Sequence, residues 1–156
     1  MEVGVRLACD VGRARIGIAR CDPQGLLATP MPAMAAGPTA TASVADLVSQ
    51  VHAVEVIVGL PLRLDGTAGP AVDLTQEWAR ALEEVLRSAG QVIPVRLVDE
   101  RLTTVQAQRG LHAAGRSTRS SRQRIDSASA VVLLQAYLDR LRAEPAARGD
   151  RTDGDR

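Results

Sequence analysis

The chain has 156 residues and a formal net charge of +1, so its bulk charge gives no argument for nucleic acid. The length fits one domain with a sizeable core. All 19 basic residues are arginine, and there is one Trp, one Tyr and no Phe. No apolar run approaches the roughly 20 residues that a membrane span needs. Cys9 and Cys21 lack C-x-x-C spacing and predict two buried thiols of a cytoplasmic protein.

Hydrophobic periodicity predicts an α/β fold in the order β-β-β-α-β-α-β-α-α. The expected strands are Val3–Ala8, Ile16–Cys21, Leu26–Met34, Val54–Gly59 and Val92–Val98. The expected helices are Thr41–Ala53, Pro70–Ala89, a short one after Thr103, and Asp126–Arg142. Residues 143–156 are polar and are expected to form a disordered tail behind one domain of residues 1–142.

Three acids stand where apolar runs meet turns or a helix start, namely Asp10, Glu100 and Asp126. Carboxylates at the ends of core elements are how a fold gathers hard oxygen ligands for Mg²⁺ or Mn²⁺. Such a site suits metal-assisted cleavage of phosphodiesters.

Asp10 lies in the segment Asp10-Val11-Gly12, between the first two predicted strands. There it could reach a metal ion, or it could simply hydrogen-bond its own hairpin turn. A strand followed by Asp-x-Gly also occurs in actin-like phosphate sites. An actin-like ATP-binding protein is therefore a third hypothesis, although only one such motif is present.

The segment 59–70 contains three glycines and two prolines between a strand and a helix. The helix N-terminus that follows favours phosphate. A simple connector with a turn at Asp65-Gly66 is an equally good interpretation.

In the segment 99–104, side-chain alternation sends Asp99 and Glu100 to different sides, so that only one of them is expected to be a ligand. Arg101 could contact phosphate or pair with a nearby acid.

Taken alone, Asp126 is best interpreted as a helix cap, because acids are favoured at helix starts. The helix dipole there would also keep it ionised, as a metal ligand requires. The stretch 109–124, just before it, contains five arginines and no acid, so we expect a loop that grips substrate or a solvated linker.

Together these segments resemble the YqgF family, also called RuvX-like, whose members are described as pre-16S rRNA nucleases or Holliday-junction-resolvase homologues. The family pattern Asp-x-Gly-x-x-Arg-Ile-Gly-x-Ala matches residues 10–19, and Gly-Leu-Pro…Asp-Gly-x-x-Gly matches residues 59–69. Asp-Glu-Arg-x-Thr-Thr matches residues 99–104, and Asp-x-x-Ala-Ala…Leu-Gln-x-Tyr-Leu matches residues 126–138, with Ser129 in place of one alanine.

The resemblance implies a ribonuclease H-like fold, with a five-stranded mixed sheet and helices on both faces. It implies that Asp10, Glu100 and Asp126 meet in one catalytic cluster holding Mg²⁺ or Mn²⁺, with two ions suspected. Related resolvases place their second acid on the fourth strand, which here ends in Gly59 without one, so Glu100 must substitute and Asp99 is its rival. The expected nucleic-acid contacts are Arg13, Arg15, Arg101, Arg116, Arg119, Arg122 and Arg124.

The first hypothesis is therefore a metal-dependent nuclease that acts on structured RNA, such as pre-16S rRNA, or on branched DNA as a Holliday junction resolvase. The second is a non-catalytic RNA-binding factor of ribosome assembly on the same fold. No membrane partner is expected, and the sequence is compatible with an oligomer.

Overall fold

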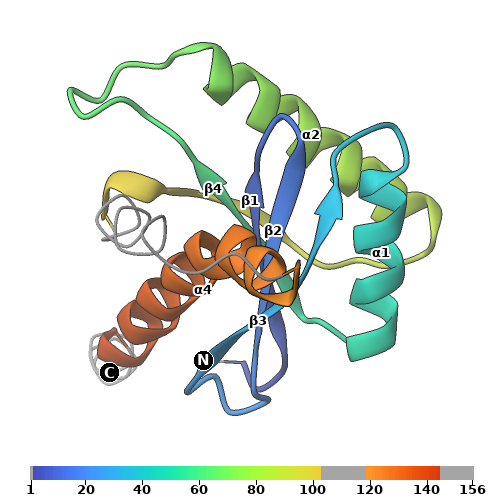
Figure 1. Ribbon diagram of the computed structural model, residues 1–156. Coiled ribbons are helices and arrows are strands. Elements are labelled where there is room, and N and C mark those ends of the chain that lie inside the picture. Colours follow the sequence, from blue (N-terminus) through green and yellow to red (C-terminus); the bar gives the residue numbers. More distant parts are fainter. Residues whose placement is uncertain (1, 103–118, 145–156) are drawn as a thin grey trace, which may run out of the picture.

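A computed structural model of the chain describes residues 2–102 and 119–144, with the side chains of residues 102 and 119–126 left out. Its elements follow the predicted order (Figure 1). The strands are β1 (Arg6–Val11), β2 (Arg15–Cys21), β3 (Ala28–Ala35), β4 (Glu55–Leu60) and β5 (Val95–Asp99). The helices are α1 (Ala40–Val51), α2 (Pro70–Ser88), the 3₁₀ turn η1 (Glu100–Leu102) and α4 (Arg119–Ala143).

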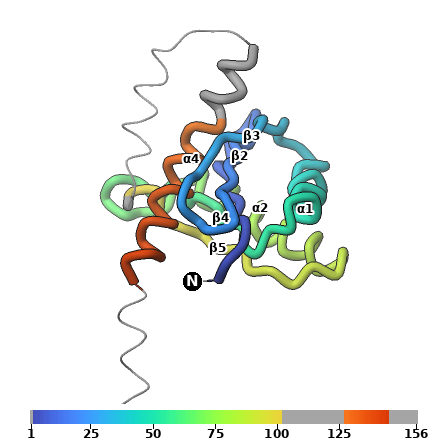
Figure 2. Tube along the Cα trace, turned by 90° about the horizontal axis from the view of Figure 1, so that it is seen from below, coloured from blue at the N-terminus to red at the C-terminus, as the bar shows by residue number. Residues whose placement is uncertain are grey.

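The five strands form one mixed sheet in the order β3-β2-β1-β4-β5. β1 is central, antiparallel to β2 and parallel to β4, and β5 runs parallel to β4 at the edge. α1 and α2 cover one face and α4 crosses the other (Figures 1 and 2). The predicted five-stranded mixed sheet with helices on both faces, typical of the ribonuclease H-like fold, is confirmed.

Side-chain alternation along the strands builds two different cores. On the α1/α2 face the central strands present large side chains, among them Leu7, Ile18 and Val56. On the α4 face they present small ones, such as Ala8 and Ala19. Small strand residues let α4 approach closely with its own leucines, so this face of the sheet is shaped for one tightly packed helix. The buried residues of α4 there are Ser127, Ser129, Ala130, Leu133, Leu134 and Leu138.

Ser127 fixes the position of α4 on the sheet. Its hydroxyl accepts a hydrogen bond from the Ile18 backbone N–H at 3.1 Å and donates one to the Met31 carbonyl oxygen at 2.6 Å. Gln135 continues this seam toward the C-terminus of the helix, where its amide oxygen accepts the Ala28 N–H at 2.9 Å. The three contacts tie the helix to β2 and β3 over its described length.

The start of α4 corrects a prediction. The helix begins at Arg119, seven residues before Asp126, so Asp126 is neither its cap nor part of its first turn. The dipole argument for Asp126 is therefore wrong. Part of the predicted basic loop is helical instead, because Arg119, Arg122 and Arg124 lie in α4. Without an apolar stripe, residues 119–125 gave no periodic signal of a helix.

Among the other boundaries that differ from the predicted ones, two concern the strands that precede the candidate acids. β1 does not stop at Ala8 but continues through Asp10 to Val11, because residues 10 and 11 pair with Gly17 and Ile16 of β2. β5 starts only at Val95, after Pro94. The predicted short helix after Thr103 and the side chain of Arg116 lie outside the described residues. Of the tail expected over residues 143–156, Ala143 is instead the last residue of α4, and residues 145–156 lie outside the described residues. Among the described residues, no helix has the length and apolar character needed to traverse a bilayer.

Candidate active site

Asp10 lies inside the central strand, on the face that α4 covers. It is two residues beyond Ala8, which packs under α4, so alternation gives both the same face. β1 and β4 are parallel, with Cys9 paired to Val58. Cys9 and Val58 are the last paired residues, and Asp10 and Gly59 are the next positions on the two strands. Asp10 thus sits at the carboxyl end of the central strands, half-buried and held by a paired backbone.

Glu100 reaches the same place from the edge of the sheet. It follows β5 directly in the 3₁₀ turn η1 and is only 8 % exposed. A Cβ atom placed on Gly59 would lie 2.6 Å from Glu100 Oε1 and 3.0 Å from Leu133 Cδ2. The Glu100 carboxylate therefore occupies the space above Gly59 that a side chain on β4 would fill. The missing Cβ of Gly59 is what admits this acid next to Asp10.

Asp99, the alternative to Glu100 as the second ligand, is bound by Arg101 instead. Arg101 donates to it from its backbone N–H at 2.9 Å and from Nη2 at 2.7 Å. These bonds hold the pKa of Asp99 below its usual range, the hydrogen bonds from the Arg101 side chain being the main cause. The Asp99 carboxylate is thus bound by a guanidinium, while that of Glu100 lies above Gly59 under α4.

Asp126 lies on the described backbone of α4, and its side chain is outside the described residues. It precedes Leu133 by seven residues of the same helix. Among the described side chains, no group of three or more His, Cys, Asp or Glu forms a cluster able to hold a metal ion. The structure places Asp10 and Glu100 at the same end of the sheet. The role of Asp126 as a third ligand stays a prediction.

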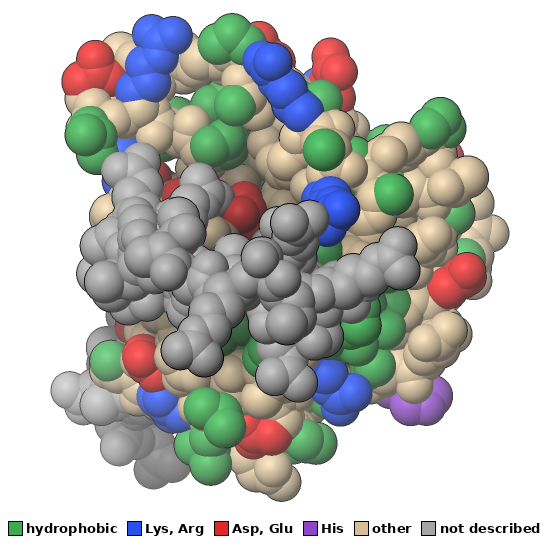
Figure 3. Space-filling model, in the orientation of Figure 1, with side chains coloured by type: hydrophobic (Ala, Val, Ile, Leu, Met, Phe, Trp, Pro, Cys, Tyr) green, Lys and Arg blue, Asp and Glu red, His purple; other side chains and the backbone are tan. Residues whose placement is uncertain are grey.

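Three of the seven arginines that were predicted to contact phosphate have described side chains at this end of the sheet. Arg13 and Arg15 are exposed in the β1–β2 hairpin, directly after Asp10 and Val11. Arg101 lies against the β4–α2 loop, 3.1 Å from where a Cβ on Gly66 would stand, but its charge is shared with Asp99. Figure 3 shows acidic side chains in a recess beneath the projecting β4–α2 loop, with arginine side chains around its rim.

The β4–α2 loop contains the turn that its sequence predicts. Asp65 accepts hydrogen bonds from the Thr67 hydroxyl at 2.7 Å and from its backbone N–H at 2.9 Å, and these bonds lower the pKa of Asp65. Gly66 has a positive φ of 89°, which completes the turn at Asp65-Gly66. The loop then delivers Pro70 to the first position of α2, as predicted.

Comparison with known proteins identifies the family. The family described as "RuvX: Holliday junction resolvase" matches residues 4–140. This chain belongs to the RuvX family. A Kineococcus radiotolerans protein named "Putative pre-16S rRNA nuclease" is 49% identical over 89% of this chain and 73% of its own length. A Clavibacter michiganensis protein of the same name is 43% identical over 100% of this chain and 99% of its own.

Among solved structures, Thermus thermophilus RuvC in complex with a Holliday junction substrate is similar to this RuvX chain, with a TM-score of 0.55. The two are 16% identical, and the match covers 88% of this chain and 96% of that one. At this identity the likeness shows a shared fold. The recognition of the YqgF, or RuvX-like, family from the four sequence segments is confirmed.

One polar group was missed by sequence reasoning. Arg6 and Glu55 were counted as parts of apolar strands, yet they form a buried ion pair across β1 and β4. The sequence feature that could have revealed this ion pair is the presence of opposite charges at the first positions of two adjacent parallel strands. This pair lies at the other end of the sheet from Asp10.

Proposed function

We propose that this chain is a divalent-metal-dependent nuclease that processes the 5′ end of pre-16S rRNA in the cytoplasm. The observation that carries the proposal is the Glu100 carboxylate above Gly59, beside Asp10 on the α4 face. The RuvX family and the shared name of relatives at 43–49% identity support a nuclease with this substrate. The family's own description supports a Holliday junction as the alternative substrate.

The donor set fits Mg²⁺ or Mn²⁺. Asp10 and Glu100 offer hard carboxylate oxygens, which these ions prefer over softer ligands. Glu100 is buried against Leu133, so bulk water is largely excluded and electrostatic attraction to a cation is strengthened. We assign Asp10, Glu100 and Asp126 as the ligands of one or two ions.

Bound divalent ions would supply a Lewis acid that activates water and stabilises the leaving oxygen of the phosphodiester. The chain's own residues prepare that step. Asp10 is fixed by pairing with Gly17 of β2, directly after Cys9, the last residue of β1 that pairs with β4. Gly59 carries no side chain, which leaves room for the Glu100 carboxylate. Positioning of this kind lowers the barrier because the ligands need no rearrangement when substrate arrives.

Arginines around the site would hold the substrate's phosphates. We assign this role to the exposed Arg13 and Arg15, and to Arg101 where it can leave Asp99. The remaining arginines assigned to it are Arg116, Arg119, Arg122 and Arg124. Contacts to phosphates position the nucleic acid and make its binding depend on salt.

The test is cleavage of labelled precursor rRNA and of a four-way DNA junction, each with Mg²⁺ or Mn²⁺. Asp10→Asn is compared with the parent and with Asp46→Asn, the same change at an exposed position of α1. We expect the precursor rRNA to be cleaved by the parent and by Asp46→Asn but not by Asp10→Asn. Cleavage of the junction alone would establish the resolvase activity instead. Tight RNA binding by all three proteins without cleavage would contradict the nuclease and favour the assembly factor.

A further inference from the structure

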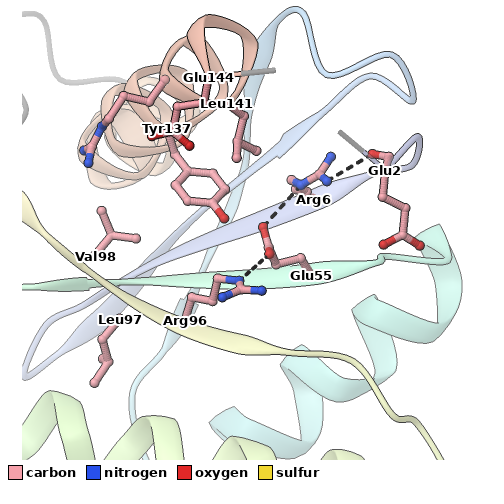
Figure 4. A pocket seen from close by; sticks show the side chains of 10 residues that line it. Glu2, Arg6, Glu55, Arg96, Leu97, Val98, Tyr137, Leu141 and Glu144 are labelled. Carbon is pink, nitrogen blue, oxygen red and sulfur yellow. Dashed lines mark hydrogen bonds and ion pairs between the residues drawn. The ribbon is translucent and has the colours of Figure 1, made fainter. Parts of the chain in front are cut away.

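A polar pocket lies at the end of the sheet opposite Asp10. It has a volume of about 690 Å³ and opens between the C-terminal half of α4 and the first residues of β1, β4 and β5 (Figure 4). Arg6 and Asp10 are four residues apart on β1, so the pocket lies roughly 13 Å from the candidate active site. The residues that matter for its chemistry are Arg6, Glu55, Arg96, Tyr137, Arg140 and Leu141.

The floor of the pocket is a buried ion network. Glu55 is 7% exposed, and each of its carboxylate oxygens is bound by a guanidinium. Arg6 Nε lies 3.2 Å from Oε1, and Arg96 Nε lies 2.6 Å from Oε2. Tyr137 points its hydroxyl toward the same carboxylate (Figure 4). Burial first, and then the hydrogen bond to Glu55, raise the pKa of Tyr137 to about 12, so its hydroxyl stays a neutral donor.

The positive charge of the guanidinium groups in this network exceeds the negative charge of Glu55. Two guanidinium groups share the single Glu55 carboxylate, which leaves one positive charge in the inner part. Arg140 on α4 is exposed at the mouth, where its charge also acts on Asp99. The other acids of the lining are Glu2 and Glu144, both exposed, and the Glu2 side chain turns away from the Arg6–Glu55 pair (Figure 4). The acids at the mouth therefore balance the total charge, while the inner part is positive.

Arg6 also has one hydrogen-bond donor that the described part of the chain does not satisfy. Its side chain is only 5% exposed, and its Nη2 donates to the Glu2 carbonyl oxygen at 3.0 Å. Its Nη1 is buried and has no hydrogen-bond partner in the described part of the chain. Leaving a buried donor unsatisfied is unfavourable, and more so when the donor is charged. An ion pair kept only for stability accounts for Arg6 and Glu55, but not for this donor, the third arginine or the open volume.

We propose that this pocket binds a phosphate group, carried by a nucleotide or by a nucleic-acid chain. Arg96, whose side chain is 57% exposed, and Arg140 contact the phosphate oxygens, and Arg6 supplies charge from below. Guanidinium groups match phosphate in geometry and charge. The Tyr137 ring and Leu141 form an apolar wall suited to an attached sugar or base. None of these residues belongs to the candidate active site, so the proposal does not depend on cleavage.

The chain offers a direct probe of this pocket. Tyr137 is its one tyrosine, and there is no phenylalanine, so the NMR signals of a tyrosine ring report on the pocket alone. Trp78, the one tryptophan, packs against the α1/α2 core on the other face and serves as an internal control. Inorganic phosphate, a nucleoside 5′-monophosphate and a short single-stranded RNA are titrated separately, in the presence of a chelator, into the parent and into Asp10→Asn.

We expect saturable shifts of the Tyr137 signals, without shifts of Trp78, in both proteins. Arg96→Gln and Arg140→Gln should each weaken binding about tenfold, as expected for one lost charge-assisted hydrogen bond. Arg80→Gln, the same change at an exposed position of α2, should leave binding unchanged. Tighter binding of the monophosphate than of the RNA would identify a nucleotide site, and tighter binding of the RNA a site for a nucleic-acid chain. Equal binding of all three probes would show that the phosphate group alone is recognised.

Two results would overturn the proposal. One is Tyr137 signals that do not move with any of the three probes. The other is binding that persists unchanged in both Arg96→Gln and Arg140→Gln. Because the titrations contain no metal and include Asp10→Asn, a failure of the nuclease proposal would leave these outcomes unaffected.

Discussion

The two ends of the central strands use the same kind of residue in opposite ways. At the amino end, the Glu55 carboxylate is buried between Arg6 and Arg96, so its charge is compensated within the protein. At the carboxyl end, Asp10 and Glu100 approach each other on the α4 face, and like charges placed close together favour binding of a cation. The first arrangement stabilises the fold, and the second is suited to metal chemistry.

This comparison predicts that removing an acid at the carboxyl end affects cleavage rather than stability. Glu100→Gln should lower the cleavage rate by more than about 100-fold, because it replaces a proposed metal ligand. Asp99→Asn, the neighbouring control, should retain most of the activity because Asp99 is bound to Arg101. Single-turnover cleavage of precursor rRNA measures both variants. If Asp99→Asn were the inactive variant, the assignment of Glu100 would be wrong.

At the amino end the opposite outcome is expected. Glu55→Ala leaves Arg6 buried without its carboxylate, which should lower the free energy of unfolding by about 3–5 kcal/mol. The exposed Glu83→Ala on α2 should change it by less than about 0.5 kcal/mol. Urea unfolding gives both values, and the cleavage rate per folded molecule should be preserved. A Glu55→Ala protein as stable as the Glu83→Ala control would show that the ion pair contributes nothing.

Gly59 connects stability and activity at the carboxyl end. In Gly59→Ala the new methyl group would meet Glu100 Oε1 and Leu133 Cδ2, so the acid or α4 must shift. We expect a loss of about 1–3 kcal/mol in stability from overpacking and about a tenfold slower cleavage from the misplaced carboxylate. In a Glu100→Gln background the effect on cleavage should disappear, because the carboxylate that Gly59 admits is already gone. Additive effects on cleavage would contradict this coupling.

Removing a single hydroxyl between α4 and the sheet should lower the stability of the protein. Ser127→Ala removes one acceptor and one donor, leaving the Ile18 N–H and the Met31 carbonyl without that partner. The expected loss is about 1–3 kcal/mol in the free energy of unfolding, measured in urea. Ser49→Ala, at an exposed position of α1, is the control and should be close to neutral. Equal stability of the two variants would mean that packing alone holds α4.

The smallest expected effect is a pH dependence at the amino end. The pKa of Tyr137 is raised from 10.0 to about 12, so the folded state favours the neutral phenol. Its contribution to stability is therefore complete below pH 10 and is lost as the pH rises toward about 12. Because this is the one tyrosine, tyrosinate absorbance should show a single transition near the upper value. A transition at 10.0 in the folded protein would show that the hydroxyl is neither buried nor held against Glu55.

Much of the fold could be predicted because local signals agree with tertiary demands. Pro70 and Gly90 mark the ends of α2, and apolar alternation marks the central strands. The errors fall where such signals are missing. Residues 119–125 are helical without an apolar stripe, and the charge of Asp10 suggested the end of a strand that in fact continues.

The candidate site was predicted in its residue types but not in its geometry. That Glu100 rather than Asp99 lies beside Asp10 depends on the register of β4 with β5 and on the empty space above Gly59. Neither can be read from the order of residues along the chain. The Arg6–Glu55 pair was missed for the same reason, since its partners are 49 positions apart and meet only through strand pairing.

The central claim is tested most directly by measuring Mn²⁺ binding to the folded protein in the absence of nucleic acid. Calorimetric titrations of the parent, of Asp10→Asn and of the control Asp46→Asn would be compared. We predict saturable binding to the parent and to Asp46→Asn that is lost in Asp10→Asn. Equal Mn²⁺ binding by all three proteins would contradict a metal site at the carboxyl end of the central strands.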